Sequence, residues 1–208
     1  MKDVTLVLTS CGRPDLLERT LESFYRYNTY PIQEAIIVED GPEHRPKFPI
    51  PNLKYLVNGV REGQVVSIDK AYAEVGTPYI FHCEDDWEFF KPGFIEASLD
   101  VLDRYTNILQ VWLRAHLDTN QHPIVTCEGF DVPILDPDYA WRGFSWNPGL
   151  RRLIDYQRIG GYGRYWQGTN AQTEWMIGDV YRGLGYRAAI LPDSEGYVRH
   201  IGWLRGVK

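Results

Sequence analysis

Short apolar runs alternate with longer stretches of helical periodicity along the first half of the chain. The runs are short and rich in apolar and β-branched residues, which is typical of strands buried in a parallel sheet. They lie at Val4–Ser10, Glu34–Gly41, Leu53–Gly59 and Pro78–Cys83. Helices are predicted from Pro14 to about Tyr27, over 61–76 and over 91–105. In the first of them, Leu17, Leu21 and Phe24 recur at helical spacing after a proline suited to a first turn.

The second half continues this pattern after an irregular segment. Strands are predicted at Ile108–Ala115 and Ala188–Pro192, and a helix over 173–187. Between them, residues 116–148 contain several prolines and few periodic runs, which indicates a functional loop or a lid. Helices that recur between apolar strands favour an α/β fold, with a mostly parallel central sheet flanked by helices. The length of 208 residues suits a single domain.

Composition narrows the class of partner. Hydrophobic residues make up 44% of the chain, which is enough for a substantial core. The formal net charge is −6 and there is no Lys/Arg run, so we expect no binding to nucleic acid. A free nucleotide is still compatible with this charge, because a metal ion supplies positive charge locally.

Cysteines and apolar segments bear on the compartment. The odd set Cys11, Cys83 and Cys127 contains no C-x-x-C pair, so neither a disulfide framework nor a zinc site is expected. We expect no transmembrane segment, because no apolar stretch approaches the ~20 residues that span a bilayer. With no leader pattern at the start, a cytoplasmic protein is expected. Peripheral contact with a membrane stays open.

Acidic residues directly follow two of the predicted strands. Glu39-Asp40 ends the second strand, and Glu84-Asp85-Asp86 ends the fourth. Ligands of open α/β sheets bind beyond the carboxyl ends of the strands, so both clusters should lie on one functional rim. Close carboxylates repel one another, and a divalent cation such as Mg²⁺ or Mn²⁺ resolves that conflict. The alternative is that these acids are solvated loop residues or helix caps.

Three segments carry a family resemblance. "VTLVLTSCGRP", "AIIVEDGPE" and "PYIFHCEDDWEFFKPGFIE" resemble, in order and spacing, glycosyltransferases of family 2-like type with the GT-A (Rossmann-like) fold. The resemblance covers roughly residues 3–100 and resumes near 145–202. It implies a nucleotide-binding half at about 1–105 and an acceptor-binding half at about 106–208. The acid triplet is similar to the family's metal-binding motif, which implies Asp86 and Glu84 as ligands of Mn²⁺ or Mg²⁺.

The same resemblance implies which residues contact the nucleotide. They are Thr9, Ser10, Arg13, Glu39, Asp40, Gly63, Asp69, Lys70 and Asp85. Ile68 stands where the family often has an arginine. Phosphate binding then comes from Arg61 or Lys70, or is missing.

The late part of the chain supplies the other candidates. "TEWMIGDVYRGLGYRAAILPD" resembles the family segment that carries the general base, which implies Glu174 at the start of a helix, with Asp179 as its rival. His200 matches a late histidine that closes the metal or diphosphate site in many GT-A enzymes, although a packed or exposed histidine is the alternative. His82 is expected to pack.

Aromatic and basic residues gather at 141–170. The candidates for acceptor and sugar binding are Trp141, Trp146, Asn147 and Trp166, because aromatic faces stack on sugar rings. Alternatively, these aromatic residues form a core under a long loop. Arg151 and Arg152 are expected either to pair with a phosphate or to be solvated.

The acid clusters and the family resemblance together imply a metal-dependent glycosyltransferase, and the resemblance alone implies an inverting one. It would move a sugar from a nucleoside-diphosphate sugar, with a UDP-sugar favoured, to a hydroxyl of a saccharide or glycoconjugate acceptor. Two alternatives stay open: a nucleotidyltransferase that forms sugar nucleotides, and a non-catalytic module that binds a nucleotide or sugar. The segment "TSCGRPD" has only one glycine and one arginine, which argues against the nucleotidyltransferase.

Overall fold

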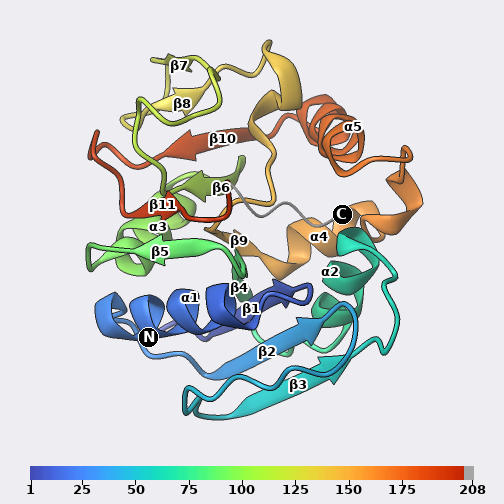
Figure 1. Cartoon of the computed structure of the whole chain (residues 1–208). Helices are drawn as coiled ribbons and strands as arrows, with labels where there is room; N and C mark the ends of the chain where they lie inside the picture. Colours follow the sequence, from blue (N-terminus) through green and yellow to red (C-terminus); the bar gives the residue numbers. More distant parts are fainter. Residues whose placement is uncertain (204–208) are drawn as a thin grey trace.

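A computed structural model describes residues 1–203. In this part of the chain, a nine-stranded sheet has the order β3-β2-β1-β4-β9-β6-β10-β8-β7, and β5 pairs with β11 in a separate ribbon (Figure 1). The sheet strands are β1 (Val4–Ser10), β2 (Glu34–Glu39), β3 (Leu53–Val57), β4 (Tyr79–Glu84), β6 (Ile108–Trp112), β7 (Ile124–Val125), β8 (Ile134–Leu135), β9 (Gly149–Arg152) and β10 (Arg187–Ile190). The ribbon strands are β5 (Trp87–Phe89) and β11 (Val198–His200). The helices are α1 (Pro14–Tyr27), α2 (Gln64–Ala73), α3 (Phe94–Arg104), α4 (Leu153–Ile159) and α5 (Asn170–Gly183), with short 3-10 turns η1 (Ala140–Gly143) and η2 (Gly163–Tyr165).

The predicted α/β fold is confirmed, and the sheet is mixed. β1 pairs in parallel with β2 and β4, β2 pairs in parallel with β3, and β10 pairs in parallel with β6. β9 lies antiparallel between β4 and β6 and joins the two halves of the sheet. Consequently β1, β2, β4 and β6 all point their carboxyl ends to the same rim, where the acid clusters were expected.

Helices cover both faces of this sheet. On one face, α1 and α3 pack against β1 and β4, with Phe24, Phe81 and Phe94 in mutual ring contact. On the other face lie α2, α4 and α5, whose apolar residues, including Ile68 and Ile177, share a second core. The side chains of β1 alternate between the two cores, because successive residues of a strand face opposite sides of a sheet.

The last predicted helix lies earlier in the chain than expected. The helix expected at 173–187 is α5, which begins at Asn170 and ends at Gly183, so Glu174 lies one turn further into the helix than expected. The side chain of Thr169 accepts a hydrogen bond from the Gln172 amide and fixes that earlier start. Residues 116–148 are mostly irregular, as predicted, apart from β7, β8 and η1.

The irregular segment packs tightly on α5. A Cβ added at Gly178 would lie 2.0 Å from the backbone oxygen of Trp141, so only glycine fits at this contact between α5 and η1. None of the helices described in residues 1–203 is both long and apolar enough to cross a membrane.

Candidate active site

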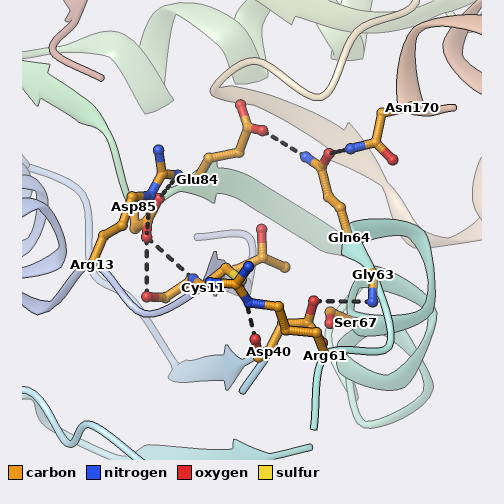
Figure 2. Close-up of a pocket in the computed structure, with 12 residues that line it drawn as sticks. Cys11, Arg13, Asp40, Arg61, Gly63, Gln64, Ser67, Glu84, Asp85 and Asn170 are labelled. Atoms are coloured by element: carbon orange, nitrogen blue, oxygen red, sulfur yellow. Dashed lines mark hydrogen bonds and ion pairs between the residues drawn. The ribbon is translucent and has the colours of Figure 1, made fainter. Parts of the chain in front are cut away.

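A cavity of about 330 Å³ opens beyond the ends of β1, β2 and β4, a volume within the usual range for small-molecule sites (Figure 2). It also borders the first turns of α2 and α5. Its lining residues are Thr9, Ser10, Cys11, Arg13, Asp40, Arg61, Gly63, Gln64, Ser67, Glu84, Asp85 and Asn170. Seven of the predicted residues are thus brought together: Thr9, Ser10, Arg13, Asp40, Gly63, Glu84 and Asp85.

Arg13 binds two acids of the triplet at once. Its guanidinium forms ion pairs with Asp85 and with Asp86, the latter from Nη1 to Oδ2 at 2.8 Å. Asp85 also accepts hydrogen bonds from the Ser10 hydroxyl and the Cys11 amide. Burial raises the pKa of Asp85 to about 6 even though Arg13 favours its ionised form.

Asp86 and His200 converge as predicted. Nε2 of His200 lies 3.2 Å from Oδ2 of Asp86, and the Ile201 amide donates a hydrogen bond to the Asp86 carbonyl. Burial disfavours the charge on Asp86, but His200 and Arg13 outweigh burial and lower the pKa of Asp86 below its usual value. Gly202 packs on the carboxylate, since a Cβ there would lie 2.3 Å from Oδ2.

This pair fits a divalent metal site with few protein ligands. A carboxylate and a neutral imidazole are ligands that Mn²⁺ accepts, and hard cations often take their remaining ligands from phosphates and water. Among residues 1–203, no group of three or more His, Cys, Asp or Glu side chains is arranged to hold a metal ion alone. A metal here would therefore need oxygens from a bound ligand.

Glu84 has both carboxylate oxygens engaged by neutral donors. Oε1 accepts from the Gln64 side-chain amide at 2.5 Å, and Oε2 accepts from the Trp87 indole at 3.2 Å. Gln64 in turn accepts from Asn170 at 2.6 Å, so a line of hydrogen bonds joins β4, α2 and α5 beside the cavity (Figure 2). Burial, then the nearby charge of Asp86, raises the pKa of Glu84 to about 8. The further expectation that Glu84 binds a metal stays a prediction.

The two acids at the end of β2, Glu39 and Asp40, have different roles, and only Asp40 lines the cavity. Asp40 accepts hydrogen bonds from the amides of Glu62 and Gly63 and from the Asn58 side chain, and so fixes the loop that leads into α2. Glu39 is fully buried and accepts from the Gly12 amide at 2.7 Å, while its Oε2 has no hydrogen-bond partner in the described part of the chain. Glu39 is not among the lining residues.

Two predicted nucleotide contacts lie elsewhere on α2. Asp69 accepts hydrogen bonds from the Tyr156 hydroxyl and from the amides of Tyr162 and Gly163, which ties α2 to the segment before η2. Lys70 is half-exposed and pairs with Glu62. Neither side chain lines the cavity, whereas Arg61, the other phosphate candidate, does.

Glu174 projects from α5 toward the same rim. The carboxylate accepts a hydrogen bond from the Trp146 amide at 2.7 Å. Burial raises the pKa of Glu174 to about 7, while Trp146, Ser145 and Arg151 limit the rise. The charge of Glu174 contributes to the raised pKa of Glu84, so the two carboxylates lie within electrostatic range. Its rival Asp179 is exposed and pairs with Arg142.

The aromatic candidates divide into two kinds. Trp146 is 3% exposed and belongs to the core, so its ring cannot stack on a sugar in this conformation, while its amide serves Glu174. Trp166 is 50% exposed, and Trp141 and Asn147 are half-buried. The sequence reasoning missed Trp203, which is exposed and stands edge-on to the His200 ring at 4.8 Å. The signal available in the sequence was its position three residues after His200, a candidate metal ligand.

Both arginines of β9 bind groups of the protein itself, Arg151 buried and Arg152 half-buried, which corrects the expectation that they are solvated or bind phosphate. Arg152 donates to the carbonyls of Leu102, Tyr105 and Ile108 and pairs with Asp155. Arg151 lies on the opposite face of the sheet, among aromatic side chains.

The mixed α/β sheet, with helices on both faces and acid clusters at the carboxyl-end rim, has the architecture of the GT-A fold. The chain belongs to glycosyl transferase family 2, whose model matches residues 5–165. Comparison with the curated proteins finds no match.

Solved structures of two glycosyltransferases share the fold. The mannosyltransferase PcManGT from Pyrobaculum calidifontis, in complex with GDP-Man and Mn²⁺, has a TM-score of 0.67 at 14% identity, over 99% of this chain and 60% of that one. TarS from S. aureus has a TM-score of 0.60 at 12% identity, over 94% of this chain and 59% of that one. This chain therefore spans about three fifths of the length of either structure.

Proposed function

We propose that the chain is a metal-dependent, inverting glycosyltransferase that takes a sugar from a nucleoside-diphosphate sugar, with a UDP-sugar favoured, to a hydroxyl of a saccharide or glycoconjugate acceptor. The observation that carries the proposal is the placement of Glu174, a half-buried carboxylate on α5, the helix whose first residue is hydrogen-bonded through Gln64 to the cavity residue Glu84. Membership in glycosyl transferase family 2 supports the reaction class.

The cavity is suited to the nucleotide part of the donor. Arg13 and Arg61 bring positive charge to its wall, and α2 points its amino end, with Gly63 at the cap, toward the same space. A helix amino end and arginine side chains both favour the oxygens of a diphosphate. Ser10, Thr9 and Ser67 add hydroxyl groups for the ribose or base.

Glu174 is the general base of the proposed reaction. Above pH 7 its carboxylate is ionised and can accept the proton of the attacking hydroxyl, and a base with a pKa near the working pH is the most effective. The acceptor oxygen then forms a bond to the anomeric carbon as the bond to the diphosphate breaks. The proton moves to Glu174, and no covalent bond to the protein is needed.

Asp86 and His200 are the residues that would hold a divalent cation, with Glu84 as a further predicted ligand. A neighbouring GT-A structure was solved with Mn²⁺, which supports a metal at this rim. When bound, such a cation would supply positive charge to the leaving diphosphate. Arg13, which pairs with Asp86 in this structure, would keep part of the acid triplet neutralised.

For the acceptor, the exposed aromatic surface is the supporting feature. Trp166 precedes α5 and Trp203 follows β11, and both expose large rings. Asn147 belongs to the 145–147 loop that binds Glu174, and Trp141 precedes this loop; both complete the candidate set. We expect these residues to affect the KM for the acceptor rather than the binding of the nucleotide.

The test is release of nucleoside diphosphate from UDP-, GDP- and dTDP-sugars with Mn²⁺ and a panel of saccharide acceptors. We expect turnover with sugars of one nucleotide, and a loss of about 100-fold or more in Glu174→Gln. Asp179→Asn removes the same charge from the exposed side of α5 and should retain activity. Full activity in Glu174→Gln would contradict the assigned base. Pyrophosphate release from a nucleoside triphosphate would favour the nucleotidyltransferase instead.

A further inference from the structure

Two consecutive arginines of β9 lie on opposite faces of the sheet, Arg151 buried and Arg152 half-buried, and they differ in how many hydrogen-bond partners they have. Arg152 binds three backbone carbonyls and Asp155. Arg151 is 2% exposed and donates one hydrogen bond, from Nη2 to the Ser145 carbonyl at 3.0 Å. Its Nε and Nη1 have no hydrogen-bond partner among the described residues.

Such an arginine is costly to keep. A guanidinium stays protonated in proteins, so burial cannot be relieved by loss of the proton. A buried charge without a counter-charge costs several kcal/mol. The groups around Arg151 are mostly neutral: the Phe144 ring lies 5.8 Å away, and Tyr72, Tyr162 and the fully buried His82 share its surroundings. None of these is a carboxylate.

The carboxylate that responds to Arg151 is Glu174. The link runs through the loop before β9: Arg151 donates to the carbonyl of Ser145, and the next amide, that of Trp146, donates to Oε1 of Glu174 at 2.7 Å. The Ser145 hydroxyl also accepts from the Asn147 amide at 3.1 Å, which tightens the same loop. Arg151 therefore fixes the peptide that orients Glu174, and its charge acts on the carboxylate.

We propose that Arg151 is a positioning residue for Glu174: its buried guanidinium anchors the 145–147 loop whose Trp146 amide binds the carboxylate. This inference rests on the proposed function, in which Glu174 is the general base. It also explains why a charged residue is retained in an aromatic core, where a well-packed apolar side chain would cost less.

Other groups act on Glu174 as well. The Trp146 amide and Ser145 contribute from the loop, Arg114 adds positive charge from the end of β6, and Glu84 faces it as a like charge from β4. Loss of Arg151 leaves these groups in place. The proton affinity of Glu174 should then rise, because one of two nearby cations is gone.

The experiment is a carboxyl ¹³C NMR titration of Glu174 without metal or nucleotide, with the signal assigned by its loss in Glu174→Gln. We expect Arg151→Met to raise the pKa of Glu174 by about one unit or more. Arg152→Met is the matched control, a half-buried arginine on the same strand but on the other face, and should leave that pKa within a few tenths. Arg151→Lys keeps the charge, so the pKa of Glu174 in this variant should lie between its values in the wild type and in Arg151→Met.

An unchanged pKa in both Arg151 variants, or an equal change in Arg152→Met, would overturn the proposal. If Arg151→Met does not fold, the lysine variant alone decides, since a lysine keeps the charge but lacks the guanidinium Nη2 that donates to the Ser145 carbonyl. The titration needs no substrate, so a shifted pKa in a protein without transferase activity would refute the proposed function and leave the positioning role standing. In an active protein, the acid limb of the kcat profile should move to higher pH in Arg151→Lys.

Discussion

Replacement of Glu174 by glutamine should stabilise the protein at neutral and alkaline pH. The pKa of Glu174 is raised from 4.5 to about 7 on folding, because burial disfavours the charged form. Between these two pH values the folded state binds more protons than the unfolded state, so stability falls as pH rises. Above pH 7 the folded protein carries the cost of ionising this half-buried carboxylate.

The size of the effect follows from the two pKa values. At about 1.36 kcal/mol per pKa unit, a change from 4.5 to about 7 corresponds to about 3 kcal/mol. Glutamine has nearly the same shape and can still accept from the Trp146 amide. We therefore expect Glu174→Gln to match the wild type near pH 4 and to exceed its free energy of unfolding by about 3 kcal/mol at pH 8.

The assay is urea unfolding at several pH values in EDTA, with Asp179→Asn as the control. Asp179 lies on the same helix but is exposed and ion-paired, so its variant should follow the wild-type pH dependence within about 1 kcal/mol. A constant difference between Glu174→Gln and wild type across pH would refute the assigned burial of this carboxylate. So would a glutamine variant that is less stable at pH 8.

Three further substitutions test the packing around the site. Arg13→Met should reduce the free energy of unfolding by roughly 3–5 kcal/mol at pH 8. The loss should be smaller at pH 5, because its partner Asp85 has a pKa of about 6 and is then mostly neutral. Urea unfolding at both pH values checks this, and equal losses would contradict it. Gly178→Ala should cost about 1–3 kcal/mol, because the added methyl meets the backbone of η1, whereas Gly183→Ala, in open space on the same helix, should not destabilise. Trp146→Ala should lower stability by about 3–5 kcal/mol, and Trp166→Ala by less than about 1, as seen by thermal unfolding; similar losses would contradict the division into core and surface.

The sequence was sufficient for the parts of the site that follow strand ends. A buried run that stops at an acid places that acid on the rim of the sheet, and the structure brings Asp40 and Asp85 to one cavity for this reason. The histidine near Asp86 was found through the resemblance alone, since nothing in the local pattern around His200 indicates that β11 returns to β5.

Other features could not be read from the pattern. β9 contains two arginines in four residues, so it does not look like a central strand, yet its backbone completes the sheet between β4 and β6. The direction of a side chain on a helix was equally difficult to predict. Asp69, for example, points to Tyr156 rather than into the cavity, because the segment around Tyr156 packs beside α2. A tertiary contact, rather than local preference, decides these cases.

Nucleotide binding that depends on metal is the central claim, and thermal unfolding tests it most directly. The protein would be heated with UDP, GDP or dTDP, each with and without Mn²⁺ or Mg²⁺, beside an Asp86→Asn variant. A ligand at ~100 times its Kd adds about 2.7 kcal/mol to the folded state, which is easily seen as a rise in Tm. We predict a rise that needs both one diphosphate and a metal and that is lost in the variant. No rise with any pair, or the same rise without metal and in Asp86→Asn, would contradict the account.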